Sequence, residues 1–389
     1  MKSEIPLSRP DLTDADRAAV LATLQGAPLS MGSALIDLER LMAEISRRTY
    51  AVGVASAGIG LEIAFRALGI GPGCEVLVPA LSYASNVNAV LAVGATPVFV
   101  DCDPRTLAMC VNDAEARISP KTRALLGVPV LGNPAGLPGL IALSSRYELP
   151  MVEHGSEGLG STIAGDCVGK FGRLCVFGFG PNRPIACGEG GVIVTNDDRL
   201  MSACRAMRSQ GRVDRASFVG QPADLGMVME FHGFGCDARL AEPLAALAAS
   251  QLSRLDEIRS ARIEIAREYT RRLAGHPSLI LPNVPENVSI SWPLFWVRLS
   301  GPFGREDRDA VIAGLHRHDI GAANHYPPCH LLPHVRAICN TTEGLCPAAE
   351  SIGDRMISLP MFTSMSVSEV RTVCQALDVI LSGLSAARP

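Results

Sequence analysis

Three side chains that can do chemistry stand in two short segments of this chain. His154 and Glu157 are three residues apart, and His154 directly follows a strand candidate at residues 150–153. Arg183 stands in a glycine-rich segment at 176–191. The pKa values of histidine and glutamate can be tuned toward neutrality, so either is a candidate acid or base. A guanidinium stays protonated and clamps carboxylates or phosphates. We predict His154, Glu157 and Arg183 as the catalytic candidates, with Arg183 orienting an anionic group.

The elements that must position these residues belong to an alternating pattern between about residues 50 and 200. Apolar, β-branched runs alternate with helical patterns at 61–68 and 86–93. This alternation predicts parallel βαβ units in an α/β sheet, whose ligands usually bind at the carboxyl ends of the strands. The expected strands are 75–78, 97–100, 124–130, 150–153, 174–177 and 191–195.

The second part of the chain has a different pattern. Leucine and isoleucine recur at helical spacing over 240–273, which predicts one long helix. An alternating strand at 289–299 and helices at 306–318 and 366–384 then predict a small α+β unit. We therefore expect a large α/β domain at 1–240, a linking helix at 241–285 and a small α+β C-terminal domain at 286–389.

Landmark segments occur in order along nearly the whole chain. They are Gly71 to Val76, Gly94 to Asp101, Gly188 to Gly191, Gln251-Leu252, His325 to Pro328 and Ser358 to Pro360. In type and order these segments resemble those of the DegT/DnrJ/EryC1/StrS sugar aminotransferases. The resemblance implies an α/β, aspartate-aminotransferase-like fold (fold type I), with a mostly parallel seven-stranded sheet and a small α+β domain. It also implies a homodimer with active sites between subunits, pyridoxal phosphate (PLP) as cofactor and nucleotide-linked keto-sugars as substrates.

The chain departs from this family at the positions that hold the cofactor. Arg183 stands where the family has its Schiff-base lysine, and His154 stands where an aspartate contacts the ring nitrogen. Gly178 and Gly58 replace two phosphate-binding hydroxyl residues. An arginine neither forms the Schiff base nor moves the proton in transamination. The sequence therefore predicts a degraded PLP site and no cofactor, with noncovalent PLP or pyridoxamine phosphate (PMP) left open.

Other positions are assigned to ligand binding through the resemblance. Tyr83 matches the aromatic residue that stacks on the cofactor, and Asp237 stands at a family asparagine. The remaining expected substrate-binding residues are Ser56, Arg239, His325 and Tyr326. Substrate specificity is expected in the loops at 209–234 and 325–334.

Three functions stay open at this point. The first is a PLP-independent site, catalytic or binding, in the biosynthesis of sugar-derived or secondary metabolites, with a nucleotide sugar or a biosynthetic intermediate as ligand. The second is a non-catalytic partner subunit that completes an active aminotransferase and lends Asp237 or Arg239 across the interface. The third is a PMP-dependent sugar aminotransferase or dehydratase. Conventional transamination is not expected.

Composition narrows the class of partner. The 389 residues are 48% hydrophobic and carry a formal charge of −4, so no basic field attracts nucleic acid or an anionic membrane. The N-terminus has no apolar signal region, and we expect a cytoplasmic protein that binds a small molecule. The twelve cysteines show no C-x-x-C pair or metal spacing, which predicts buried thiols and no metal site.

Overall fold

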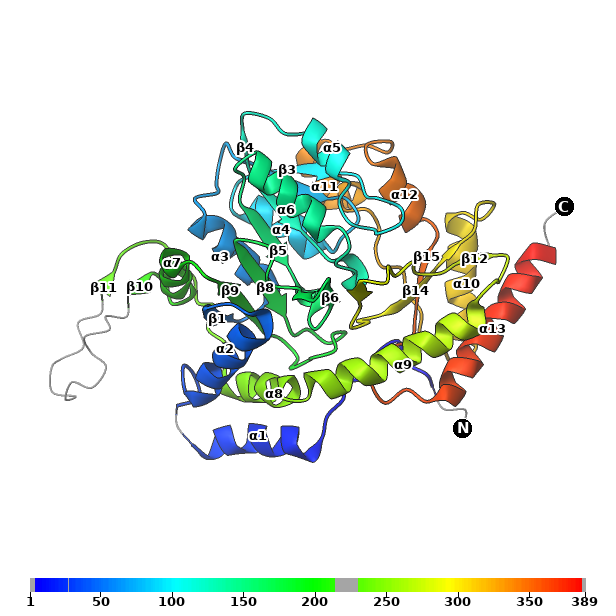
Figure 1. Ribbon diagram of the computed structural model, residues 1–389, viewed down its shortest axis with the longest axis horizontal. Helices are drawn as coiled ribbons and strands as arrows, with labels where there is room; N and C mark the ends of the chain where they lie inside the picture. The colour runs from blue at the N-terminus through cyan, green and yellow to red at the C-terminus, as the bar shows by residue number, and fades with distance from the viewer. Residues whose placement is uncertain (1–3, 27, 214–229, 387–389) are drawn as a thin grey trace.

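A seven-stranded sheet forms the centre of the computed structural model, which describes residues 4–26, 28–213 and 230–386 (Figure 1). Its strand order is β1-β9-β8-β5-β4-β2-β3. Only β9 runs antiparallel to its neighbours, so the predicted, mostly parallel sheet is confirmed. The strands are β1 (Tyr50–Val54), β9 (Gly191–Thr195), β8 (Leu174–Gly178), β5 (Met151–His154), β4 (Thr122–Gly127), β2 (Glu75–Pro79) and β3 (Thr96–Val100).

Helices cover both faces of this sheet, which explains why its strands read as continuous apolar runs. Along β8, Leu174 and Val176 pack into the cluster beneath α3, α4 and α7, whereas Cys175 and Phe177 pack into the cluster beneath α2 and α8. The helices of the first face are α3 (Ala57–Ala67), α4 (Ala84–Ala92) and α7 (Asp198–Arg208). Those of the second are α2 (Ser33–Ser46), α5 (Val111–Ala116), α6 (Leu137–Arg146) and α8 (Glu242–Leu252).

Two helices occupy the region predicted as one helix at 240–273. The helix is interrupted after α8 at Ser253 and Arg254, and α9 (Leu255–Leu273) continues toward the C-terminal unit (Figure 1). At the break, the Arg254 guanidinium pairs with the carboxylates of Asp11 and Asp16, at 3.2 Å each. These contacts join the break to the N-terminal segment and to α1 (Asp14–Gln25).

The C-terminal unit is a small antiparallel sheet with helices, as predicted. The expected strand at 289–299 is interrupted, because Trp292 adopts φ 51° between β13 (Val288–Ser289) and β14 (Phe295–Leu299). The sheet order is β12-β14-β15, with β12 (Leu279–Ile280) and β15 (Met356–Leu359). The helices here are α10 (Arg305–Arg317), α11 (Pro333–Cys339), α12 (Pro347–Gly353) and α13 (Val367–Ala386). The domain boundaries at 240 and 286 stay a prediction.

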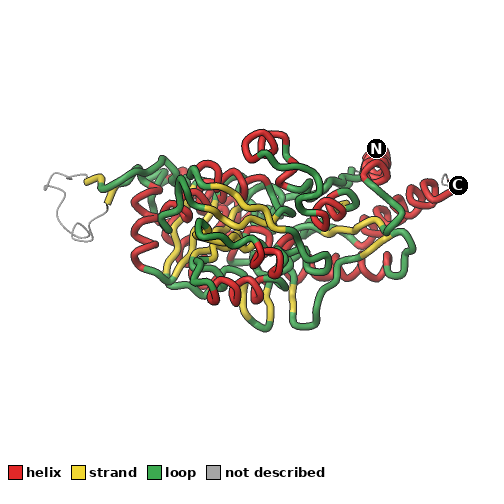
Figure 2. Tube along the Cα trace, turned by 90° about the horizontal axis from the view of Figure 1, so that it is seen from above, coloured by secondary structure: helices red, strands yellow, loops and turns green. Residues whose placement is uncertain are grey.

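Two short strand pairs complete the described chain. β6 (Thr162–Ile163) and β7 (Asp166–Cys167) form a sheet with β13. The pair β10 (Arg212–Val213) and β11 (Glu230–Phe231) lies at one end of the long axis, and the two ends of the chain lie toward the other (Figure 2).

The N-terminal segment runs along both parts of the molecule. Ile5 pairs with Ile320 of the C-terminal unit, and its N–H donates to the Asp319 carbonyl at 2.9 Å. The Met361 N–H donates to the Leu7 carbonyl at 3.0 Å. The chain then enters α1, where Asp16 accepts a hydrogen bond from Ser250 of α8 at 2.6 Å. Residues 5–16 therefore contact the C-terminal unit and the large sheet's helices in succession.

The described residues contain no candidate membrane-spanning helix, disulfide or metal-binding group. None of their helices is both long and apolar enough to cross a membrane. All twelve cysteines are free and none is exposed. Within the same residues, no group of three or more His, Cys, Asp or Glu side chains is arranged to hold a metal ion.

Candidate functional site

A cavity of about 250 Å³ opens at the carboxyl ends of β5 and β8, where α3 begins. This is the edge at which ligands usually bind in such sheets. The segment after β8 forms one wall, and the C-terminal unit supplies another. Predicted site residues that line it are Ser56, Gly58, Tyr83, His154, Gly178, Arg183, His325 and Tyr326.

Arg183 and Glu157 form an ion pair at this cavity. Arg183 Nη1 lies 3.3 Å from Glu157 Oε1, and the Arg183 side chain is only 17% exposed. The Tyr326 hydroxyl donates to the same oxygen, and the Leu131 N–H donates to Oε2 at 2.5 Å. Both carboxylate oxygens of Glu157 are therefore engaged, and Glu157 links segments from three parts of the chain.

Arg183, Glu157 and Tyr326 shift the pKa values of one another. Burial opposes the charged form of Arg183, but the Glu157 carboxylate and the Tyr326 hydroxyl raise its pKa above the ordinary value. Burial and the adjacent Glu157 charge raise the pKa of Tyr326 well above its usual range. Arg183 is therefore a permanent cation, and Tyr326 stays a neutral hydrogen-bond donor.

His154 is buried, and both of its ring nitrogens have partners. Nδ1 lies 2.6 Å from Asn86 Oδ1, and Nε2 lies 2.7 Å from Ser156 Oγ. Burial and, to a smaller extent, the nearby Arg183 charge lower the pKa of His154 to about 4, against the opposing effect of Glu157. His154 is therefore a neutral imidazole, with Nδ1–H donating to Asn86 and Nε2 accepting from Ser156. This arrangement leaves neither nitrogen free for a ligand.

The start of α3 packs tightly against the end of β8. A Cβ atom on Gly178 would lie 2.7 Å from the Ala57 Cβ and 3.2 Å from Ser156 Oγ. A side chain on Gly58 would meet only Ser56 Oγ, at 3.8 Å. Ser56 itself caps α3 by accepting a hydrogen bond from the Ile59 N–H. The Ala57 side chain therefore leaves no room for a side chain at position 178, whereas a side chain at position 58 would enter open space.

His325 approaches the cavity from the C-terminal unit. Its Nδ1 lies 2.9 Å from the hydroxyl of the buried Ser358 on β15. Burial lowers the pKa of His325, with the Arg183 charge acting in the same direction and Glu157 against it. Tyr83 stands at the mouth, 51% exposed, with its ring 5.7 Å from that of Tyr326. The cavity thus combines a neutral histidine, a fixed cation and an accessible aromatic face.

Comparison with known proteins identifies the chain. The model of the DegT/DnrJ/EryC1/StrS aminotransferase family matches residues 10–378. The chain belongs to this family. Its structure is similar to that of S. venezuelae DesV in complex with a ketimine intermediate, at 32% identity and a TM-score of 0.87 over 99% of each chain.

Two further solved structures support the fold. The aminotransferase TlmJ from Streptoalloteichus hindustanus is 27% identical, with a TM-score of 0.88 over 98% of this chain and all of that chain. Spr1654 from Streptococcus pneumoniae, in its PMP form, is 24% identical with a TM-score of 0.92 at the same coverage, and shows likeness of fold alone. The predicted aspartate-aminotransferase-like fold is confirmed by these similarities.

Three predicted residues of this family member do not line the cavity of the single chain. Glu157 is buried and contacts the lining residues Arg183 and Tyr326. Asp237 and Arg239 are exposed and bind each other, with Arg239 Nη2 2.9 Å from Asp237 Oδ1. Their predicted role at a subunit interface stays a prediction. Part of the specificity loop expected at 209–234 lies outside the described residues.

The sequence did not single out several residues that hold the site together. Asn86 and the Leu131 N–H are far in sequence from their partners His154 and Glu157, and no local pattern announces them. Ser156 lies between these two partners, so its position was a usable signal. Ser358 opens the Ser-Leu-Pro landmark, but its side-chain role depends on contact with His325.

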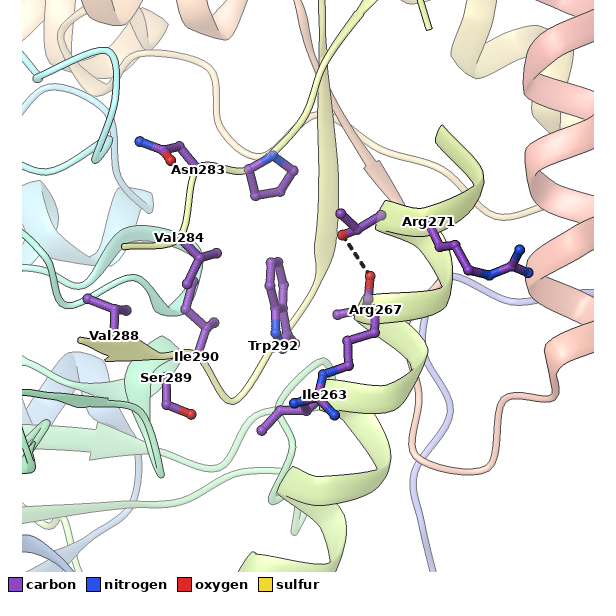
Figure 3. A pocket seen from close by; sticks show the side chains of 12 residues that line it. Ile263, Arg267, Arg271, Asn283, Val284, Val288, Ser289, Ile290 and Trp292 are labelled. Carbon is purple, nitrogen blue, oxygen red and sulfur yellow. Dashed lines mark hydrogen bonds between the residues drawn. The ribbon is translucent and has the colours of Figure 1, made fainter. Parts of the chain in front are cut away.

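A larger hollow of about 700 Å³ lies beside α9, away from this cavity. Figure 3 shows Trp292 standing between α9 residues such as Arg267 and a wall that carries Val284. Arg267 and Arg271 already pair with Glu264 and Glu268, at 2.5 and 2.7 Å. Among the residues that the structure describes, these two arginines are the titratable side chains that line the hollow.

Proposed function

We propose that this family member works without PLP and uses the former cofactor cavity for another small polar ligand. Its role would lie in the biosynthesis of sugar-derived or secondary metabolites. The observation that carries the proposal is the Arg183–Glu157 ion pair, which Tyr326 completes, at the position of the family's lysine. This ion pair gives the charged Arg183 side chain a structural partner, which a Schiff-base lysine at the same position would not need.

Lysine chemistry has no other source near the cavity. Lys121 is exposed, Lys170 pairs with Asp166 at 2.5 Å on the surface, and neither lines the cavity. Lys2 lies outside the described residues. Without an amine, the covalent attachment of an aldehyde cofactor has no nucleophile in this part of the chain.

The remaining cofactor positions do not fit PLP either. A pyridine ring nitrogen is kept protonated by a carboxylate, whereas His154 is neutral and hydrogen-bonded on both sides. Ala57 fills the space that a serine at position 178 would need. These contacts support a site that has been repacked around its own residues.

The ligand we propose is a carbonyl-containing sugar, as the nucleotide-linked keto-sugars of the family would be. A cavity of about 250 Å³ suits a single sugar ring, with any nucleotide extending outside it. Arg183 has five N–H donors, and Glu157 and Tyr326 engage only part of this set, so we propose that another N–H group binds a carbonyl or anionic oxygen. Tyr83 offers a flat apolar face at the mouth.

Titration with PLP and, separately, with PMP tests this function. Absorbance and binding heat are followed, with S. pneumoniae Spr1654, known in PLP and PMP forms, as the positive control. We expect no saturable binding to this chain at millimolar ligand. The variant Arg183→Lys should also fail to bind, because His154 and Ala57 remain. Saturable binding to the unaltered chain would overturn the proposal and favour a PMP-dependent reaction.

A second candidate function is that of a partner subunit. The exposed Asp237–Arg239 pair favours it, because these residues lie outside the chain's own cavity and are free to contact another subunit. Co-expression with a lysine-bearing relative, followed by mass measurement of the purified assembly, tests this alternative. A stable mixed dimer would support it, and a homodimer alone would remove it.

A further inference from the structure

The titratable groups around the cavity differ in how far their atoms are already engaged. Both nitrogens of His154 have partners, and both oxygens of Glu157 accept hydrogen bonds. The Tyr326 hydroxyl donates its proton to Glu157. None of these three groups is free to take a proton from a ligand without first losing an internal hydrogen bond.

His325 differs from them, because only one of its ring nitrogens is engaged. Nδ1 contacts Ser358 Oγ, while Nε2 has no hydrogen-bond partner among the residues that the structure describes. The ring lines the cavity from the C-terminal unit. When Nδ1–H donates to Ser358, the lone pair on Nε2 is available as a base.

Ser358 fixes the orientation of this ring. The serine is fully buried on β15, and its backbone exchanges hydrogen bonds with Ala323. Within the described chain, His325 Nδ1 is the one partner of its hydroxyl. Ser358 is therefore a positioning residue that holds the His325 ring in place, and the tautomer in which Nδ1–H donates to Ser358 Oγ is the one that leaves Nε2 as a base.

Arg183 supplies the complementary charge. It lines the same cavity, and it is close enough to His325 to lower the pKa of that imidazole. Because Glu157 holds Arg183 in place, the remaining N–H groups form a fixed donor set for an oxygen that gains negative charge. A base and an oxyanion donor thus share one cavity.

We propose that His325 and Arg183 catalyse cofactor-free enolisation of a ligand with a carbonyl group, such as a keto-sugar. His325 Nε2 removes a proton from the carbon next to the carbonyl. The C–H electron pair forms the C=C bond, and the carbonyl π pair moves to the oxygen, which Arg183 holds. Return of the proton to the opposite face of the same carbon gives epimerisation. Where that carbon carries a hydroxyl, transfer of the hydroxyl proton to the oxyanion and return of the first proton to the former carbonyl carbon gives isomerisation. Neither outcome needs an oxidant or a cofactor. This inference rests on the proposed PLP-independent site.

Chemical modification of histidine tests the free nitrogen without any ligand. Diethyl pyrocarbonate acylates unprotonated, accessible imidazoles, and peptide mass spectrometry locates the product. We expect modification of His325 before His154, with the exposed His334 as an internal reference. Reaction of His154 at the same rate as His325 would overturn the assignment.

The variant Ser358→Ala tests the positioning role of Ser358. It should change the ratio of the two neutral tautomers of His325, measured in ¹⁵N imidazole spectra. An unchanged ratio would exclude a positioning role for Ser358.

Hydrogen exchange tests the reaction itself. Hydroxyacetone and a thymidine-diphosphate-linked 4-ketohexose are incubated with the full chain in D₂O, and loss of the signal next to the carbonyl is followed by NMR. His325→Gln is expected to slow exchange by about 100-fold, the lower range for a general base, whereas the surface variant His334→Gln should not. Exchange with the unaltered chain no faster than with His325→Gln, for both probes, would overturn the inference.

These outcomes separate the inference from the proposed function. Saturable PLP binding would remove the proposed function, even with His325 reactive. Absence of PLP binding together with absence of exchange would leave the proposed function standing and remove the enolisation.

Discussion

The contact between Gly178 and Ala57 gives a quantitative prediction. A serine at position 178 places its Cβ 2.7 Å from the Ala57 Cβ, whereas ordinary contacts begin at 3.4 Å. The Ala57 methyl stands directly on the first residue of α3 and has no rotamer to change. Gly178→Ser should therefore overpack the site and lower the free energy of unfolding by about 1–3 kcal/mol.

Removal of the Ala57 methyl should relieve most of this cost. Ala57→Gly alone is expected to cost up to about 1 kcal/mol, because glycine is a poorer helix residue. The double variant should then be more stable than the sum of the single effects predicts, with a coupling of about 1–2 kcal/mol. Gly58→Ser is the matched control, because its side chain enters open space and should be neutral or stabilising by up to about 1 kcal/mol.

Urea unfolding of the four variants measures these differences through their midpoints at constant slope. The reasoning is refuted if Gly178→Ser is as stable as Gly58→Ser, or if the Ala57 and Gly178 effects simply add. In either case Ala57 would not exclude a serine, and the steric part of the argument against PLP would fail.

Two further predictions concern the buried charges. Glu157→Gln should destabilise the protein by about 3 kcal/mol because it leaves Arg183 unpaired, and the double variant with Arg183→Met should lose less; equal losses in thermal unfolding would contradict this. His154 has a folded-state pKa of about 4, below its ordinary 6.5, so the unfolded chain binds its proton first as pH falls. Its contribution to stability should be fully present above pH 6.5 and be lost down to about pH 4, by up to about 3 kcal/mol in unfolding measurements. His154→Gln should abolish this part of the pH dependence, and an unchanged profile would show that another group causes it.

The sequence predicted the sheet well because its strands are buried on both faces. Runs such as residues 75–78 and 174–177 are apolar for that reason, and β2 and β8 extend each by only one residue. The break between α8 and α9 escaped prediction because Leu252 and Leu255 keep the apolar pattern across it, while Arg254 at the break finds its partners near the N-terminus. The strand is interrupted at Trp292 because this residue has a positive φ, which cannot be predicted from a tryptophan side chain.

The sequence predicted which residues form the site better than it predicted what each residue does. The family pattern alone was enough to predict Arg183, His154 and Tyr326 as site residues, and all three line one cavity. Which nitrogen of a histidine is free depends on partners such as Asn86 and Ser358, and those come from distant segments. Proton-transfer roles therefore required three-dimensional contacts that residue type and spacing do not contain.

The path of the N-terminal segment has a consequence for how this chain is made. Ile5 and Leu7 are synthesised long before their partners Asp319 and Met361. At about 5–20 residues per second, the segment with Ile5 and Leu7 waits unpaired while the residues between are made. The large sheet can form meanwhile, and the segment docks only after Asp319 and Met361 have been synthesised. A domain fused directly ahead of Ile5 is therefore expected to slow this docking step.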